Sequence, residues 1–269
     1  MRRFLLYLVI TTGALIMLLP LVWMVSTSLK PPEEVFTYPI RWIPENIRWM
    51  NFVDVFTVIP LARYFFNSIL VSTTVMVGNL FFCTLAGLSL AKYNYPGKDI
   101  IFVLVLGTMM IPVQMIFLPL FLVVKVLGLV NTYGALILPN IINPMGVFLM
   151  RQMIMDVPQD LMDSARIDGA SEWTIYWKMI LPIIKPPMAA LAIFIFVWTW
   201  NAFLWPMIST SSKELFTLPV GLSAFQDMYG TQYNLLMAGM VVSTAPIVTL
   251  FLFLQKQFIK GLTFSGLKG

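Results

Sequence analysis

The chain has 269 residues, of which 59% are hydrophobic and only 11% are charged, and its formal net charge is +5. A soluble domain carries about 25% charged residues, so this composition excludes an ordinary soluble fold and indicates that a lipid bilayer is the solvent. The chain contains no histidine. This excludes the usual zinc-hydrolase sites and the Ser/His or Cys/His pairs of nucleophilic catalysis.

Six charge-free windows of 25 to 28 residues follow one another along the chain: 4–29, 64–91, 100–124, 126–150, 186–212 and 228–255. A helix needs about 20 apolar residues to cross the hydrocarbon core of a bilayer. The sequence therefore predicts an all-α membrane protein with six transmembrane helices. Only Lys125 and a short turn separate the third and fourth windows, and prolines 112, 119, 139 and 144 favour kinked or interrupted helices there.

Basic residues set the expected orientation, because cytoplasmic loops carry an excess of Lys and Arg. With the N-terminus inside, eleven basic residues lie in the cytoplasm and six lie outside. We therefore expect both termini and the loop 151–185 to be cytoplasmic. The net positive charge follows from this asymmetry, so it does not call for a nucleic-acid partner.

A few polar side chains fall within or beside the predicted spans: Gln114, Asn140, Asn143 and Asn201, the last beside Trp198. Polar groups in the membrane face neighbouring helices or a cavity, where they find hydrogen-bond partners. Two interpretations stay open, helix packing and the lining of a substrate pathway. All five residues are candidates for the pathway.

The spans contain no acidic or basic side chain, which argues against an ion-coupled carrier. The chain also contains no G-x-x-x-x-G-K motif followed by Ser or Thr, so it does not hold ATP phosphates itself. We expect no catalytic residue, metal site or cofactor in this chain. The energy for transport must then come from a partner.

The loop 151–185 is the most charged part of the chain, with nine of its 29 charged residues. It is expected to form two short helices separated by a turn. Asp156 and Pro158 suit the start of the first helix. Leu161 and Ala165, four residues apart, are expected to form its apolar face.

The turn between these helices is expected at Gly169, which tolerates backbone angles that clash with a side chain. Ser171 is expected to cap the second helix, which would end near Pro182. The result would be a compact polar knob on a membrane protein.

Three short segments of this loop carry a family resemblance: Asp163-Ser164-Ala165, Asp168-Gly169-Ala170 and Ile180-Leu181-Pro182. They resemble the "EAA" loop of binding-protein-dependent ABC importers, although Asp163 stands where the family has Glu and Ser164 where it has the first Ala. In that family the loop supplies a coupling helix that enters a groove on the ATP-binding subunit. The resemblance implies a coupling role for Asp160, Asp163, Ala165, Arg166, Asp168 and Gly169.

Segment 91–99 also resembles the ABC permease family, and three further segments resemble its carbohydrate-uptake branch: 44–52, 198–206 and 255–269. The last of these, 255–269, is typical of the maltose-permease-like smaller subunit of that branch. The resemblance extends from about residue 26 to residue 269. It implies the type I ABC importer permease fold in the cell (cytoplasmic or inner) membrane. The expected domains are a first helix with its external connection at 1–62, a permease core at 63–260 and a cytoplasmic tail at 261–269.

The implied function is import of an oligosaccharide or related sugar or polyol by alternating access. The implied partners are a second, homologous permease subunit, two copies of an ATP-binding subunit that holds ATP and magnesium, and an extracytoplasmic solute-binding protein. A permease for amino acids, peptides or phosphate is the main alternative. An ATP-independent six-span channel or carrier and a membrane-embedded enzyme are further alternatives, and the resembling loop disfavours them.

Overall fold

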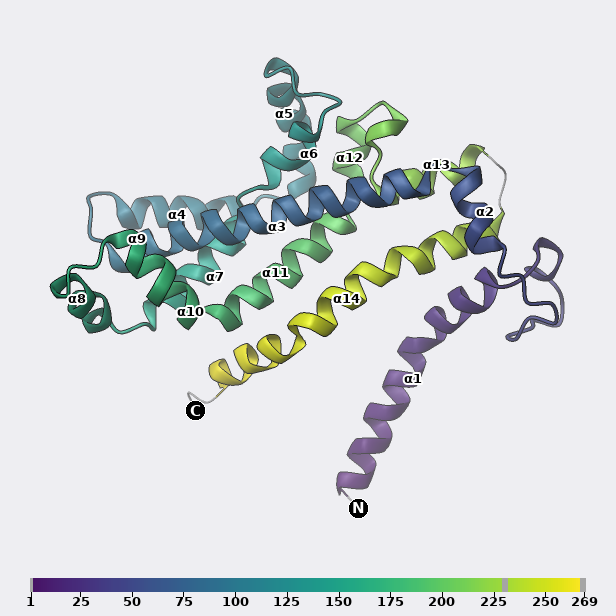
Figure 1. Ribbon diagram of the computed structural model, residues 1–269, viewed down its shortest axis with the longest axis horizontal. Coiled ribbons are helices and arrows are strands. Elements are labelled where there is room, and N and C mark those ends of the chain that lie inside the picture. Colours follow the sequence, from purple (N-terminus) through teal and green to yellow (C-terminus); the bar gives the residue numbers. More distant parts are fainter. Residues whose placement is uncertain (1, 229–231, 267–269) are drawn as a thin grey trace. The chain divides into compact units, whose positions relative to one another are not determined.

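The computed structural model describes the backbone at residues 2–228 and 232–266, and the side chains at residues 3–223 and 232–256. Within these ranges every regular element is a helix and none is a strand (Figure 1). The all-α class expected from the composition is therefore confirmed.

The helical elements follow each other along the chain with short connections. In chain order they are α1 (Arg2–Ser28), η1 (Pro32–Glu34), α2 (Asn51–Val58), α3 (Leu61–Lys92), α4 (Lys98–Met109), α5 (Val113–Val126), α6 (Tyr133–Ile137), η2 (Leu138–Asn140), α7 (Pro144–Met155), α8 (Gln159–Ile167), α9 (Glu172–Ile175), η3 (Tyr176–Ile180), α10 (Leu181–Ile183), α11 (Lys185–Trp200), α12 (Leu204–Ser209), η4 (Lys213–Leu215), α13 (Leu218–Met228) and α14 (Tyr233–Gly266). The element η3 is a π-helix, and the other η elements are 3-10 helices.

Four helical segments of the described chain are long and apolar enough to cross a membrane: Arg3–Ser28, Leu61–Lys92, Tyr133–Met155 and Tyr233–Lys256. Two helix pairs reach the same length only together, and each pair is bent. Lys98–Met109 and Val113–Val126 meet at 107°, and Glu172–Ile183 and Lys185–Trp200 meet at 80°. By length and composition the described chain therefore has four candidate spans, or up to six if each bent pair counts as one.

The third predicted window is interrupted where its first proline stands. Helix α4 ends at Met109, and α5 begins at Val113, directly after Pro112. Proline disfavours helical angles in the residue before it, so a helix usually ends there and a new one can begin after it. Pro144 opens α7 for the same reason. The expected interruption in this region is confirmed.

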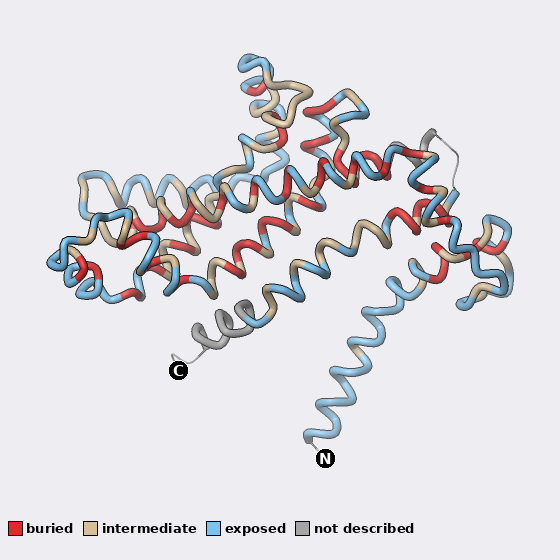
Figure 2. The backbone as a smooth tube through the Cα atoms, viewed as in Figure 1, coloured by how far each residue is buried: buried red, intermediate tan, exposed pale blue. Residues whose placement is uncertain are grey.

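Helix α1 is exposed along almost its whole length (Figure 2). Its most apolar 18-residue window is not buried at all inside the chain, and its mean hydropathy is 2.4. A helix that is apolar all round and unburied needs a lipid or protein environment, because water would meet its whole apolar surface. This exposure agrees with a membrane-spanning role for α1.

Contacts divide the chain into two compact units. The first unit comprises Met1–Phe66 and Thr217–Pro246, and the second comprises Asn67–Phe216 and Ile247–Gly269. This division follows contacts in space and does not test the domains expected from the sequence, which stay a prediction.

Buried polar side chains organise the first unit. Asn51 donates hydrogen bonds from its side chain to the backbone oxygens of Ser28 and Lys30, at 2.9 and 2.8 Å, and accepts one from Asn234 at 3.0 Å. The Lys30 ammonium group is fully buried, donates to the backbone oxygen of Arg41 at 2.6 Å and lies 4.2 Å from the Trp23 ring centroid. These bonds fix the segment that follows α1.

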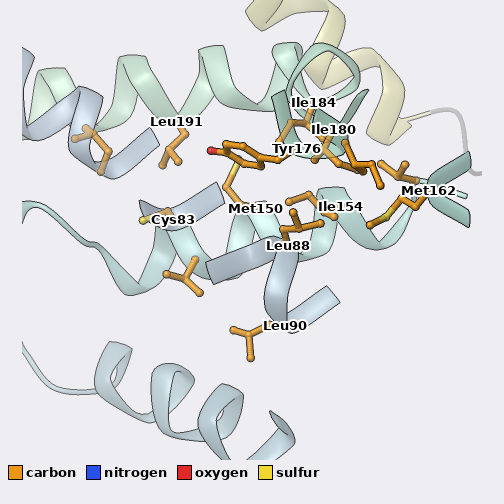
Figure 3. Close-up of a cluster of buried hydrophobic side chains, with 14 of the residues drawn as sticks. Cys83, Leu88, Leu90, Met150, Ile154, Met162, Tyr176, Ile180, Ile184 and Leu191 are labelled. Atoms are coloured by element: carbon orange, nitrogen blue, oxygen red, sulfur yellow. The ribbon is translucent and has the colours of Figure 1, made fainter. Parts of the chain in front are cut away.

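The core of the second unit joins α3 to the charged loop. Its buried side chains come from α3, α7, α8, η3 and α11 and are drawn in Figure 3; they include Cys83, Leu88, Met150, Ile154, Met162, Tyr176, Ile180, Ile184 and Leu191. Helices α3 and α7 lie close together at Gly87, where a Cβ atom would lie 2.8 Å from both the backbone nitrogen of Arg151 and the Cβ of Met150. Only glycine fits there without a shift of the backbone.

This close approach gives a stability prediction. Gly87→Ala should destabilise the protein by about 1 to 3 kcal/mol, because the new methyl group forces apart two packed helices. The matched control is Gly107→Ala in α4, where a Cβ meets nothing within 4 Å. We expect a lower melting midpoint of the detergent-solubilised protein for the first variant and an unchanged or slightly higher one for the second. Equal midpoints would contradict the close crossing.

Candidate functional site

The charged loop forms the two short helices expected from the sequence. Helix α8 covers Gln159–Ile167, a turn follows, and the second helical segment runs from Glu172 through η3 to Ile183. Figure 1 shows this pair at the end of α3 and α7. The expectation of a compact knob between helices is confirmed, and α8 together with residues 168–183 is called the knob below.

Gly169 makes the turn of the knob possible. Its φ is +82°, in the left-handed region where residues with a Cβ are strained, and a Cβ there would meet nothing within 4 Å. Its backbone nitrogen donates to the oxygen of Arg166 at 3.0 Å, and that of Ala170 donates to the oxygen of Ala165 at 2.9 Å. These two bonds close the end of α8 in the manner of a glycine cap.

Of the two helix caps expected from the sequence, the structure confirms the one at α9 but not the one at α8. Ser171 caps α9 as expected, because its hydroxyl oxygen accepts a hydrogen bond from the Thr174 nitrogen at 3.2 Å. Pro158, and not Asp156, is the N-cap residue of α8. Asp156 stands at the end of α7, and Pro158 precedes α8 without a side-chain hydrogen bond to the helix. The tight connection between α7 and α8 places Asp156 at the preceding helix end.

The buried face of α8 differs from the expected one. Met162 and Ala165 are buried, whereas Leu161 is 43% exposed. The expected pairing of Leu161 with Ala165 was wrong, because Met162 enters the core formed with α7 and η3 and this contact sets the rotation of α8. Met162 and Ala165 are three residues apart, which is equally compatible with one helix face.

The six residues expected to couple the chain to an ATPase occupy three kinds of position. Ala165 lies in the core, and Arg166 is engaged in contacts within the loop. The remaining four are exposed: Asp160, Asp163, Asp168 and Gly169. Ile167 lies beside them and is 86% exposed. The exposed surface of the knob therefore combines carboxylates with large apolar side chains, of which Ile167 is the most exposed.

Arg166 ties the two helices of the knob together. It donates to Asp163 at 2.6 Å and to both carboxylate oxygens of Glu172, at 2.8 and 3.2 Å. The Tyr93 hydroxyl donates to the same Glu172 carboxylate. These bonds from Arg166 and Tyr93 favour the charged carboxylate and lower the pKa of Glu172, while the contact with Glu172 raises the pKa of Arg166.

Three of the five candidate pathway residues line one cavity in the second unit. The cavity has a volume of about 430 Å³, and its wall includes Asn140, Asn143 and Trp198. Asn143 also caps α7, because its side-chain oxygen accepts from the nitrogens of Met145 and Gly146, at 2.8 and 3.4 Å. Asn140 donates to the Leu136 oxygen at 3.0 Å. The two amides thus serve helix packing and face the cavity as well.

Gln114 and Asn201 do not belong to the wall of this cavity. Gln114 is exposed in the first turn of α5, and Asn201 is exposed at the end of α11, where its side chain donates to the Val197 oxygen at 2.9 Å. The structure therefore gathers part of the expected pathway set, and the role of all five residues stays a prediction.

Sequence inspection missed the buried amide of Asn79. Its side chain donates to the backbone oxygens of Asn140 and Val75, at 2.7 and 3.2 Å, and accepts a hydrogen bond from the Cys83 thiol at 3.4 Å. It supports the cavity wall at Asn140 from behind. An asparagine in the middle of an apolar window was the available signal, since an amide within a span must find partners inside the protein.

Comparisons with known proteins agree with these features. Residues 83–264 match the family described as "Binding-protein-dependent transport system inner membrane component". The arabinooligosaccharides transport system permease proteins of Halalkalibacterium halodurans and Bacillus subtilis are 42% and 40% identical, over 95% of this chain and over 93% and 92% of theirs. The sn-glycerol-3-phosphate transport system permease protein of Yersinia enterocolitica is 31% identical, over 93% of this chain and 92% of its own.

Two solved structures share the fold. A chain of a bacterial ABC transporter that imports the acidic polysaccharide alginate superposes with a TM-score of 0.83 and 23% identity, covering 96% of this chain and 97% of its own. A chain of the bacterial alginate ABC transporter in complex with an alginate pentasaccharide-bound periplasmic protein gives a TM-score of 0.66 and 16% identity, over 94% and 93%. The expected type I permease fold is confirmed.

The ion pair within the knob gives a pH prediction. The lowered pKa of Glu172 means that its charged form stabilises the folded knob above the unfolded carboxyl pKa of about 4.3, and that this contribution is lost as the pH falls through the lower folded value. Glu172→Gln should lower stability at pH 7 by at most about 1 kcal/mol, since the pair is half-exposed. Melting midpoints of both proteins from pH 7 to 3.5 should differ at pH 7 and converge below pH 4. A constant difference over the whole range would contradict the ion pair.

Proposed function

The chain belongs to the family of binding-protein-dependent transport system inner membrane components, and on that premise we propose that it is the permease subunit of an importer that moves a carbohydrate with energy from a separate ATP-binding subunit. The family inferred from the loop is confirmed, as is the inner membrane as its location. The knob is the observation that carries the energy-coupling part of this proposal.

The knob has the form that a mechanical link requires. Its inner face is buried through Met162, Ile175 and Tyr176, so it cannot slide over the helices beneath it. Its outer face carries Asp160, Asp168 and the exposed Ile167, which suit a groove with apolar and cationic side chains. Seating this face in the ATP-binding subunit would pass the closure of that subunit on to the membrane helices.

The energy that such a link must pass on is modest. Moving a two-state pore from 1:99 to 99:1 requires about 5.5 kcal/mol of differential binding. A partner that closes on ATP can supply this only if the link does not yield. The bonds of Arg166 to Asp163 and Glu172 stiffen the knob in this sense.

The proposed assembly holds this chain, a second homologous permease, two copies of the ATP-binding subunit, which bind ATP and magnesium, and an extracytoplasmic solute-binding protein. One structure with the same fold is an ABC transporter in complex with a periplasmic protein. In the proposed orientation both termini and the loop 151–185 lie in the cytoplasm. Six spans, with each bent helix pair counted as one, are compatible with this arrangement.

The proposed transported substrate is an uncharged carbohydrate or polyol. Several relatives are named for arabinooligosaccharide transport. The cavity offers the amides of Asn140 and Asn143 for hydroxyl groups and Trp198 for a sugar face. Among the residues that the structure describes, its wall includes no Lys or Arg that would pair with an acid. This composition of the wall favours a neutral sugar over a glycerol phosphate, the solute named for another relative.

Gly169→Asp tests the coupling role of the knob. The added carboxylate both strains the left-handed turn and enlarges the outer face, so we expect insertion of the chain at wild-type levels but loss of the ATP-binding subunit, or about tenfold less transport per ATP hydrolysed. The measurement is affinity purification from the native membrane, with mass spectrometry of the co-purifying subunits and a transport assay.

Gly128→Asp is the matched control for this variant. Gly128 has φ +69° and equally open surroundings, but it lies in the turn between α5 and α6 outside the knob. We expect wild-type complex yield and transport for Gly128→Asp. Wild-type behaviour of Gly169→Asp, or equal loss in both variants, would contradict the coupling role.

A further inference from the structure

The last residue of α3, Lys92, and the turn that follows it contact the knob and the connection that leads into it. The Lys92 ammonium group donates to the backbone oxygens of Val157 and Met155, the latter at 3.3 Å. These carbonyl groups lie where α7 ends and the chain turns into α8. Carbonyls at a helix end have no partner within the helix, so a cation that binds them fixes that end.

Tyr93, the next residue, contacts the knob at the C-terminal end of α8 and the start of α9. The Tyr93 hydroxyl donates to the Glu172 carboxylate, and the Arg166 guanidinium lies 5.9 Å from the Tyr93 ring centroid. Burial, followed by the hydrogen bond to Glu172, raises the pKa of Tyr93, so the hydroxyl keeps its proton for this bond. Two consecutive residues thus hold both the start of α8 and the start of α9.

Beside the hydrogen bond between Tyr93 and Glu172, α3 and α9 are not packed directly against each other. A cavity of about 290 Å³ separates α3 from α9, and it is lined by Leu85, Leu88, Ser89, Tyr93, Glu172, Trp173 and Tyr176. The surfaces of α3 and α9 are therefore not closed against each other there. Deeper in the unit, α3 contacts η3, where the Thr84 and Tyr176 hydroxyls lie 2.6 Å apart. The Tyr93 hydroxyl bridges the open side of this gap.

We propose that Lys92 and Tyr93 are positioning residues that clamp the knob onto α3, so that displacement of the knob by an ATPase moves the α3 span. This inference rests on the proposed function, and it names the contacts that transmit movement of the knob to the membrane helices. Lys92 and Tyr93 act through the knob and touch neither solute nor nucleotide.

Tyr93→Phe tests the clamp with the loss of one oxygen atom. The complete transporter is reconstituted in liposomes, and the ratio of solute molecules imported to ATP hydrolysed is measured per assembled complex. We expect this ratio to fall about three- to tenfold while assembly with the ATP-binding subunit stays at the wild-type level, since the outer face of the knob is unchanged. A merely structural role would lower yield and leave the ratio unaltered.

Tyr95→Phe is the matched control, because it makes the same chemical change two residues away. The Tyr95 hydroxyl accepts a hydrogen bond from Ser89 of α3 at 3.3 Å and is not part of the contacts with the knob given above. We expect a wild-type ratio for this variant.

The double variant Tyr93→Phe/Glu172→Ala, compared with Glu172→Ala alone, separates the clamp from a general effect. Each change removes one partner of the same hydrogen bond, so the double variant should have the ratio of Glu172→Ala alone, whereas unrelated effects would multiply. A wild-type ratio in Tyr93→Phe, loss of its assembly, or multiplying effects would overturn the clamp. Failure of the wild-type chain to associate with any ATP-binding subunit would instead overturn the proposed function.

Discussion

The contact on which the knob depends is the packing of Met162, on the inner face of α8, into the core. A charged loop on a membrane protein transmits displacement only when its backbone cannot move independently of the spans. Met162 is fully buried in a core shared with Ile154 and Ile180, from the helix before the knob and the helical segment after it. Together with the buried Ile175 and Tyr176, this side chain makes a hydrophilic connection a rigid extension of the membrane helices.

Electrostatics then divides the charged residues of the knob between two tasks. Arg166 neutralises Asp163 and Glu172 within the loop, which stiffens it. Asp160 and Asp168 remain exposed beside Ile167 and give the outer face its acidic and apolar character. Arg166 therefore stabilises the shape of the knob, while the exposed carboxylates of Asp160 and Asp168 can contact a partner.

Features governed by local backbone chemistry were predictable from the sequence. The apolar windows required helices, Gly169 required a left-handed turn, and Ser171 required a helix cap, because each depends on a few neighbouring residues. The family resemblance of the loop was equally readable, since spacing and residue types carried it.

Features that depend on packing were not predictable in the same way. Leu161 and Met162 are similar side chains one residue apart, and only the core beneath α8 selects the second. Gln114 and Asn201 matched the pattern of pathway residues, but their helices turn them away from the cavity wall. The contacts of Lys92 across more than 60 residues of sequence left no local signal at all.

The most direct test of the central claim is site-specific photo-crosslinking from the outer face of the knob in native membranes. A photoreactive amino acid replaces Ile167, which is 86% exposed, and in a parallel sample replaces Val126, which is 87% exposed at the end of α5. The account predicts that position 167 captures an ATP-binding subunit and position 126 does not. Capture of no such subunit at position 167, or of the same proteins at both positions, would contradict it.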